Sequence, residues 1–359
     1  MIPANELHAT LCLASLRGLG LTRKLALLEQ HSAVAAWQQL QQGQFDNLSL
    51  PVSALSDAMA QAEQALQWQS AAPARHLLSL TDPRYPQALA QIADPPLMLF
   101  VQGQVEALSA PALAMVGSRN ASRPGLELAQ SWAHSLASIG WVMVSGLAVG
   151  IDGACHKGAL NGGITVAVLG CGLNHCYPKR HRALFQAIPQ QGALVSEFWP
   201  DTQVKPHHFP MRNRIVSGLS LGLIVVEAGM KSGSLITARL AAEQGREVFA
   251  VPGSVMEPNR EGCHWLIQQG AKLTTSPVDI TEELVPQLSL DWDGPAHSQD
   301  CGLPHPSLLD SVGYEATAVD VVVQRSEMPI DVVLERLTEL ELEGWVAAVP
   351  GGYIRLRGG

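Results

Sequence analysis

Aromatic and charged side chains are scarce in this chain of 359 residues: Phe, Trp and Tyr make up 5% of it, and Asp, Glu, Lys and Arg make up 15%. No apolar run reaches the roughly 18 residues that cross a bilayer. Residues 1–17 lack the basic segment and cleavage site of a secretory signal. The hydrophobic content of 47% is typical of a globular protein. We therefore expect a cytoplasmic protein that does not enter a membrane.

The six cysteines form no CxxC pair. Cys171 and Cys176 lie close together with His175 between them, but no second pair completes a zinc site. Free thiols in a reducing cytoplasm are the better interpretation. We expect no metal.

The net charge of −9 argues at first against a nucleic-acid partner, but the charge is unevenly distributed. Residues 115–240 contain 11 Lys and Arg against 5 Asp and Glu, a balance of +6, so the remainder sums to −15. Because salt confines electric fields to about 10 Å at 0.1 M, a basic centre can hold a polyanion although the chain is acidic overall.

The composition divides the chain into four segments. Residues 1–72 carry leucines at helical spacing around a Gly-x-Gly turn, which predicts a helical domain of the helix-hairpin-helix or SAM-like type. Residues 73–288 form the Rossmann-like domain argued below. Residues 289–306, rich in Asp, Gly, Pro and Ser, predict a linker. Residues 307–359 show two helices followed by a hairpin, the order of a winged-helix domain.

The turn Gly18-Leu19-Gly20 has two interpretations. Its backbone N–H groups can face a phosphate, with Arg23 and Lys24 close by. Alternatively, the glycines let two helices of a plain hairpin pack closely. We favour the plain hairpin.

Six short apolar runs rich in β-branched residues alternate with amphipathic stretches in the centre of the chain. Such runs suit a sheet that is buried on both faces, and their alternation with helices favours parallel strands. We predict an α/β fold with a central doubly wound, Rossmann-like parallel sheet. The expected strands are 112–116, 141–145, 165–169, 193–197, 221–226 and 247–251.

In an open parallel sheet, ligands bind at the carboxyl ends of the strands, and most of the unusual residues fall in loops there. The loop after the first strand offers Gly117 for close approach, Ser118 as a hydroxyl and Arg119 as a planar fork for phosphate. The glycine-rich loop 145–152 suits a phosphate-facing turn and leads to Lys157. Its last residue, an aspartate, has the alternative role of a helix cap.

The third loop holds Gly172 and, further on, Lys179. It does not fit the dinucleotide fingerprint, because His175 stands where a third glycine is needed and no acid follows about 20 residues on. We therefore expect no nicotinamide cofactor. The loop remains a candidate for phosphate.

The most specific segment is 207–214, which places Phe209, Arg212, Asn213 and Arg214 at an expected helix start. Helix N-termini favour anions, and an aromatic side chain can stack on a base for roughly 1–3 kcal/mol. The alternative is that the Phe209 ring is buried in the core and that the arginines form ion pairs with carboxylates at two strand ends. Of these residues, Arg214 is the one for which we most expect such a structural role.

The last loop, after the fifth strand, combines Lys231, Ser232, Gly233 and Ser234 into a second candidate anion site. Glu227 precedes it, and we expect this acid to orient an arginine. We find no nucleophile–base pair and no paired carboxylates at a useful spacing. The sequence predicts no catalytic residue.

These segments, in this order, resemble the DNA-processing protein A family, also called DprA or Smf. The matching motifs span about 160 residues, and they are Gly-Ser-Arg at 117–119, Ser-Gly-x-Ala-x-Gly-Ile-Asp at 145–152, Tyr-Pro at 177–178, Phe-Pro-x-Arg-Asn-Arg at 209–214, Ser-Gly-Ser-Leu-Ile-Thr-Ala at 232–238, Phe-Ala-Val-Pro-Gly at 249–253 and Leu-Ile-x-x-Gly-Ala at 266–271.

The resemblance implies a protein that binds single-stranded DNA without strong sequence preference and dimerises through its Rossmann-like domain. It also implies a mediator that helps to load the RecA recombinase during natural transformation. Arg119, Lys179 and the segment 209–214 would line the DNA pocket.

Two other classes of function compete with this hypothesis. One is a nucleoside-monophosphate-processing enzyme on the same type of fold, but Ala238-Arg239-Leu240 follows the serine-rich turn where such enzymes carry a catalytic glutamate. The other is a protein-interaction adaptor. The second winged-helix helix carries five acids against one base, so we expect this domain to contact protein, either a partner or the chain's own basic centre, and not a DNA groove.

Overall fold

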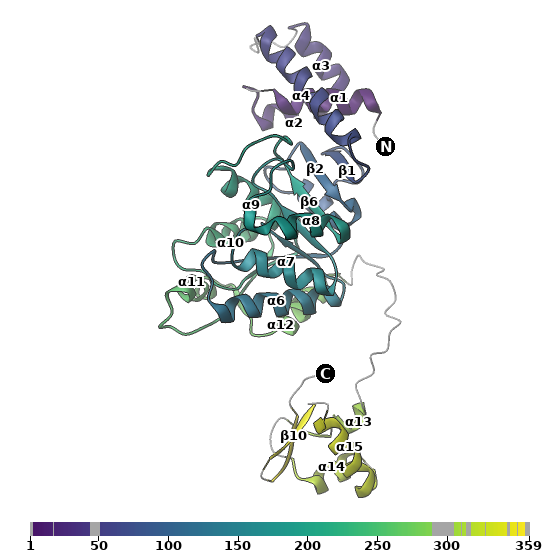
Figure 1. The fold of residues 1–359 in the computed structure, drawn as a ribbon, viewed down its shortest axis with the longest axis vertical. Coiled ribbons are helices and arrows are strands. Elements are labelled where there is room, and N and C mark those ends of the chain that lie inside the picture. Colours follow the sequence, from purple (N-terminus) through teal and green to yellow (C-terminus); the bar gives the residue numbers. More distant parts are fainter. Residues whose placement is uncertain are drawn as a thin grey trace. The chain divides into compact units, whose positions relative to one another are not determined.

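The structure is a computed structural model that describes residues 3–16, 18–43, 51–288, 305–309, 311–313, 317–326, 328–342, 345–349 and 351–355. The chain forms two compact units, Met1–Leu290 and Asp291–Gly359 (Figure 1). Most of the expected linker, residues 289–304, lies outside the described residues.

In the described part of the first unit, four helices precede the sheet. Their buried side chains form one hydrophobic cluster with residues of the sheet, and the Trp68 ring meets Phe100 edge-on at 5.7 Å. The helices and the sheet therefore share a core. The helices are α1 (Ala4–Ser15), α2 (Leu21–Gln30), α3 (Ala33–Gln41) and α4 (Val52–Ser70).

The Gly18-Leu19-Gly20 turn lies between α1 and α2. Gly18 has a φ of +88°, which glycine adopts without strain, and a Cβ at Gly18 or Gly20 would meet nothing within 4 Å. Backbone conformation, not close packing, explains Gly18. Lys24 is buried and its Nζ donates to the Ala14 carbonyl at 2.7 Å, so this lysine is not available to a phosphate.

Within the described residues the main sheet has nine strands in the order β1-β2-β6-β5-β4-β3-β7-β8-β9. Strands β3 to β9 are mutually parallel, whereas β1 and β2 join the β6 edge in antiparallel pairing. The strands are β1 (Arg75–Ser79), β2 (Met98–Gly103), β3 (Ala112–Val116), β4 (Val142–Ser145), β5 (Thr165–Val168), β6 (Ala193–Ser196), β7 (Gly222–Val225), β8 (Glu247–Ala250) and β9 (Lys272–Leu273).

Alternate residues of each strand pack on opposite faces of the sheet. In β5, Val166 and Val168 join the cluster beneath α9, α10 and α11, whereas Ala167 joins the cluster beneath α8. In β4, Met143 faces α6 and α7. The first face is covered by α5 (Gln87–Ala90), α9 (His208–Gly218), α10 (Gly233–Glu243) and α11 (Glu261–Gln268), and the other face by α6 (Arg123–Ser138), α7 (Ile151–Gly162), α8 (Arg182–Gln191) and α12 (Pro277–Leu288).

The predicted fold class is confirmed: helices cover both faces of a parallel sheet, and all six expected strands form. Three strands were not predicted. β1 and β2 flank a proline-rich stretch that hides their pattern, and β9 has two residues, too few for any periodicity. Three short 3₁₀ turns complete the unit, namely η1 (Val105–Leu108), η2 (Lys179–His181) and η3 (Pro258–Arg260).

The described residues of the second unit form three helices and a hairpin around a small core of their own. The two expected helices and the hairpin of a winged helix are present, and the short helix before them was not predicted. Residues Leu308, Val322, Leu337 and Val346 are buried in it. Its elements are α13 (Pro306–Leu309), α14 (Val319–Ser326), α15 (Ile330–Leu342), β10 (Val346–Val349) and β11 (Gly352–Arg355). Among the described residues of both units, no helix is long and apolar enough to span a membrane.

Candidate functional site

The strand order reverses direction at β3, which lies between β4 and β7. The chain proceeds from β3 outward through β4 to β6 on one side, and from β7 to β9 on the other. Ligands of open α/β sheets bind at such a switch point, beyond the carboxyl ends of the strands. A groove of about 770 Å³ lies there, lined by the loops after β3 and β7 and by the start of α9.

The loop after β3 forms the floor and one rim of the groove. A Cβ at Gly117 would lie 2.6 Å from the Ile151 side chain and 2.9 Å from the Glu227 carbonyl, so only glycine fits. Ser118 N donates to that carbonyl at 2.7 Å, and the Ser118 hydroxyl accepts from Asn120 N at 3.1 Å. Arg119, the charged residue of this loop, is exposed.

Arg119 lies over an aromatic pair at the rim. Its guanidinium carbon is 5.2 Å from the centroid of the Phe209 ring, and the Tyr177 ring lies 5.6 Å from Phe209 on another side. Phe209 is half-buried and Tyr177 is 46% exposed, so both rings keep accessible surface. The alternative that Phe209 is a core residue is not what the structure shows.

Arg212 lies at the bottom of the groove and is only 3% exposed. Its Nη1 donates to the Val168 carbonyl, and its Nε has no hydrogen-bond partner. The described residues place no carboxylate within ion-pair distance of it. Burial lowers the pKa of this guanidinium, yet arginine stays protonated. A buried cation without a paired anion is costly, and an anionic ligand would relieve that cost.

Asp152 is the carboxylate that interacts electrostatically with Arg212, and it already accepts hydrogen bonds from the backbone. Its Oδ2 accepts N–H groups from Gly146 at 3.2 Å and Ala148 at 3.3 Å. Burial raises the pKa of this carboxyl, while Arg212 and the two N–H groups oppose the rise. Asp152 is therefore not a simple helix cap, and because it fills the turn, the loop 145–152 does not offer these two N–H groups to a phosphate.

Two histidines fix the same loop at Leu147, whose φ of +55° is unusual for a residue with a side chain. The Leu147 N–H donates to His156 Nε2 at 3.3 Å, and His181 Nδ1 lies 3.0 Å from the Leu147 carbonyl. His156 Nδ1 meets the Thr165 hydroxyl at 2.8 Å, and that hydroxyl donates to the Met143 carbonyl. His156 must accept at Nε2, so it is neutral. Its burial lowers its pKa to about 3.

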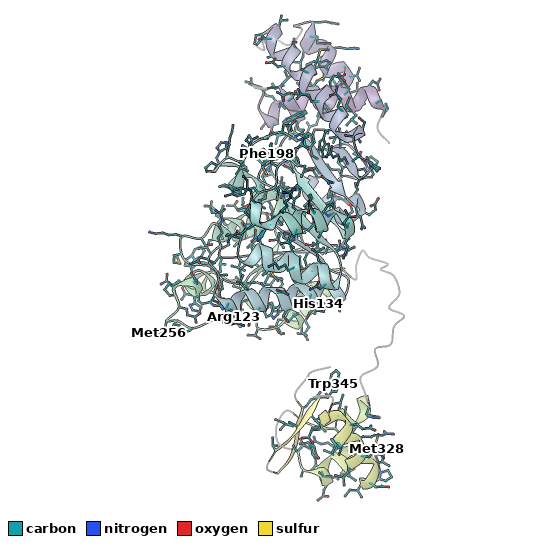
Figure 2. The ribbon with its side chains drawn as sticks, viewed as in Figure 1. Arg123, His134, Phe198, Met256, Met328 and Trp345 are labelled. Atoms are coloured by element: carbon teal, nitrogen blue, oxygen red, sulfur yellow. The ribbon has the colours of Figure 1, made fainter. Side chains whose placement is uncertain are left out.

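On the β7 side, Glu227 holds three loops together. Its buried carboxylate accepts the backbone N–H and the hydroxyl of Ser122, which caps α6, and pairs with Arg260 Nη2 at 3.0 Å. Arg260 also donates to the Val226 carbonyl at 2.8 Å. Glu227 thus orients an arginine as predicted, and that arginine is Arg260 from the loop after β8. Figure 2 shows Met256 at the outer edge of that loop.

The N-terminus of α10 closes the groove. Ser232 caps the helix by accepting from Ser234 N at 3.3 Å, and the two hydroxyls lie 2.6 Å apart. Lys231 and Gly233 beside them are exposed. The positive end of a helix dipole therefore faces the same space as Arg119 and Arg212.

Ten of the fourteen residues expected at the site line this groove together: Gly117, Ser118, Arg119, Phe209, Arg212, Asn213, Lys231, Ser232, Gly233 and Ser234. Four do not. Arg214 forms ion pairs with Glu197 at 2.6 Å and with Asp94 at 3.0 Å. It therefore has the structural role that the sequence offers as the alternative to ligand binding. A Cβ at Gly172 would lie within 2.2 Å of the carbonyls of Trp199 and Pro200, so this glycine serves backbone packing.

Lys157 and Lys179 are exposed, on α7 and in η2, away from the groove lining. Arg180, next to Lys179, instead lines a smaller cavity of about 230 Å³ that shares Arg119, Tyr177 and Phe209 with the groove. Sequence reasoning also missed Asn120 and Asn259, whose side chain donates to the Asn120 carbonyl at 3.2 Å. Isolated asparagines in loops carry no pattern that would have revealed them.

The cysteines and histidines at 171–176 make contacts with the protein backbone. In the described parts of both units, no three His, Cys, Asp or Glu side chains are grouped so that they could bind an ion. Cys171 Sγ contacts the His175 carbonyl at 3.5 Å, and Cys176 Sγ contacts the Pro178 carbonyl at 3.7 Å.

Comparisons with known proteins agree with this architecture. Residues 76–285 match the family model described as DNA recombination-mediator protein A, and residues 296–352 match that of the DprA winged helix domain. Protein Smf of Escherichia coli K12 is 48% identical over 320 residues, covering 86% of this chain and 83% of that protein. DNA processing protein DprA of Streptococcus pneumoniae R6 is 47% identical over 206 residues, 57% of this chain and 73% of that protein.

Two solved structures are similar as well. The crystal structure of DprA from Streptococcus pneumoniae superposes with a TM-score of 0.66 at 36% identity and covers 79% of this chain and 99% of that one. The Helicobacter pylori DprA structure, which describes a single-stranded DNA binding mode of that protein, gives a TM-score of 0.53 at 30% identity over 56% of this chain and 93% of that one. Since one family model alone covers more than half of the sequence, this chain belongs to the DNA recombination-mediator protein A family.

Proposed function

We propose that this protein binds single-stranded DNA in the groove at the β3–β7 switch point. The observation that carries the proposal is the buried Arg212 guanidinium, which lacks a paired anion and lines the same groove as the exposed Arg119. With Lys231 and the α10 N-terminus, these groups suit a sugar–phosphate strand.

The aromatic rim supports a single strand over a duplex. Stacking on Phe209 and Tyr177 requires a base with a free face, and bases inside a duplex have none. Such stacking is tolerant of sequence, because every base has a π-face. The single-stranded DNA binding mode of the Helicobacter pylori relative is consistent with this choice.

A nucleoside-monophosphate-processing enzyme is the weaker alternative. Asp152 is the groove-lining carboxylate of the described residues, and it is buried beneath two backbone N–H groups. Glu243, the first acid after the serine-rich turn, pairs with Arg239 at 2.7 Å on the exposed side of α10. Neither is placed as a general base, so we infer a binding protein and not an enzyme.

Membership of a recombination-mediator family extends the proposal. We infer that the protein protects incoming DNA and helps to load RecA recombinase during natural transformation, in the cytoplasm and as a homodimer formed through the Rossmann-like domain. The family match over residues 76–285 supports this role.

The test is a gel shift of the full chain with oligo-dT and with a duplex of equal length across a salt series. We expect preferential binding of the single strand. Its logarithmic affinity should fall with the logarithm of salt by a slope of about −0.7 per phosphate neutralised. Equal affinity for both DNAs, or binding that does not change with salt, would refute the proposal. Release of free base from a nucleoside monophosphate would favour the enzyme instead.

A further inference from the structure

Helix α15 in the second unit exposes large apolar side chains beside its buried stripe. Its inward residues Val333, Leu337 and Leu340 are fully buried in the unit's core. Ile330 and Leu334 border this stripe on one side of the helix, and they are 52% and 43% exposed. The two are four residues apart, so they lie side by side one helical turn apart.

Acidic side chains lie beside this apolar pair, on the side away from the buried stripe. Asp331 and Glu335 are exposed and have no ion pair or hydrogen bond within the described part of the chain. Glu339, one turn further, lies 3.1 Å from His305 Nε2. The basic residue of the helix, Arg336, is half-buried and contacts the sulfur of Met328 at 3.4 Å, so it does not neutralise the face. Figure 2 marks Met328 in this unit.

This charge excludes the usual partner of a winged helix. A recognition helix in a DNA groove brings its exposed residues against phosphates and base edges. Residues 307–359 contain four Arg against nine Asp and Glu, a net charge of −5. Two unpaired carboxylates on the exposed helix face would meet phosphates of the same sign.

We propose that Ile330 and Leu334, with Asp331 and Glu335 beside them, form a docking face for a basic amphipathic helix of a partner protein. The partner would place two apolar side chains one turn apart against the pair, with Lys or Arg facing Asp331 and Glu335. The apolar contact supplies affinity, and the charges fix orientation and speed association. A face of this size suits a transient complex. The proposal does not depend on the DNA groove.

The test uses the full chain and a fluorescent synthetic helix with Leu at positions i and i+4 flanked by Lys, followed by anisotropy at low and moderate salt. A second helix of the same charge with Ser in place of Leu tests the apolar contribution. We expect the Leu helix to bind at least tenfold more tightly than the Ser helix. Equal binding of the two helices would overturn the proposal.

Variants locate the face. Ile330→Ser with Leu334→Ser should reduce binding of the Leu helix at least tenfold, and Asp331→Asn with Glu335→Gln should reduce it several-fold and flatten its salt dependence. Helix α4 gives matched controls, since it exposes Val52 at 81%, Met59 at 42% and the acids Asp57 and Glu63. Val52→Ser with Met59→Ser, and Asp57→Asn with Glu63→Gln, should leave binding unchanged.

Far-UV circular dichroism and thermal unfolding confirm that each variant is folded. Two results would overturn the proposal: unchanged binding by the folded α15 variants, or an equal loss in the α4 controls, which would mean general attraction to an acidic protein. Duplex DNA that binds wild type and is lost in the Ile330→Ser, Leu334→Ser variant would assign the face to nucleic acid and refute a protein partner.

Discussion

At the scale of single residues, the groove separates arginines that look equivalent in sequence. Arg212 and Arg214 are two positions apart on α9, yet one faces the groove floor without a paired acid and the other is held between Glu197 and Asp94. A helix turns about 100° per residue, so neighbours two apart lie on opposite sides. The sequence identifies the cluster of cations and marks Arg214 as the most structural of them, but it does not show that Arg212 is buried without a paired acid.

Arg119→Ala should weaken binding of oligo-dT about tenfold or more, because it removes a charge-assisted phosphate contact worth roughly 1.5–3 kcal/mol. The salt slope should become shallower by about 0.7. Lys157→Ala is the matched control: it also removes one exposed cation of the first unit, but it lies outside the groove lining. Arg212→Ala should also weaken binding. If Arg119→Ala and Arg212→Ala both bound like wild type, the groove would not be the DNA site.

His156 predicts how stability depends on pH. Its pKa is about 3 in the folded protein against an ordinary value of 6.5, because burial disfavours its charged form. Below pH 6.5 the unfolded chain therefore binds a proton that the folded chain excludes. The free energy of unfolding should fall as the pH drops from 6.5 towards 3, by about 1.4 kcal/mol per pH unit from this group.

Urea unfolding at pH 7 and pH 5 measures the effect of His156. His156→Gln should be less stable at pH 7, because the hydrogen bond from the Leu147 N–H to His156 is weakened. Between pH 7 and pH 5 it should lose less stability than wild type. Substitution of the exposed His134 to Gln, on α6, is the control and should leave the pH dependence as in wild type. A His156→Gln variant with an unchanged pH dependence would contradict the assignment of this histidine as the buried neutral group.

At the scale of elements, close contacts between backbones determine the conformations of the loops, and no single residue in the sequence predicts these contacts. Gly150 has a φ of +83°, and a Cβ there would lie 2.1 Å from the Ser118 carbonyl. This contact fixes the loop before α7 against the loop that carries Arg119. The glycine motif 145–152 predicts a turn that faces a phosphate. In the structure, Gly150 instead packs against the loop that carries Arg119, and the N–H groups of Gly146 and Ala148 donate to Asp152.

Gly150→Ala should therefore destabilise the protein and also weaken DNA binding. The left-handed backbone alone costs an alanine roughly 1–2 kcal/mol, and the clash with Ser118 adds to that cost. Gly140→Ala is the matched control, since Gly140 has a φ of +98° with nothing within 4 Å of its Cβ position. It should show only the backbone cost in urea unfolding and should bind oligo-dT like wild type. Equal loss of stability in both variants would show that the loop contact contributes nothing.

The elements themselves were largely predictable, for a physical reason. Strands β3 to β7 are buried on both faces, and the second half of β8 is buried as well, so they form apolar runs between glycine and polar loops. The edge strands β1 and β9 are partly exposed and carry mixed residues such as Arg75 and Lys272. Their pairing is decided by neighbours in space, which a local pattern does not contain.

At the scale of the whole molecule, opposite charges are assigned to different parts of the chain. Residues 115–240 carry a balance of +6 and supply nearly all of the groove, whereas residues 307–359 carry −5. The two compact units have separate hydrophobic cores, so one can be removed without opening the other.

Deletion of residues 307–359 should therefore leave the affinity for oligo-dT equal to that of the full chain or raise it, because an acidic unit near a polyanion can only repel it. If repulsion operates, the gain should appear at low salt and vanish at moderate salt, since the Debye length shortens from about 30 Å at 0.01 M to about 10 Å at 0.1 M. A truncated chain that carries Arg119→Ala serves as the control, because it should lose binding as the full-length variant does. A large loss of affinity on deletion alone would mean that the winged helix itself binds DNA, in spite of its charge.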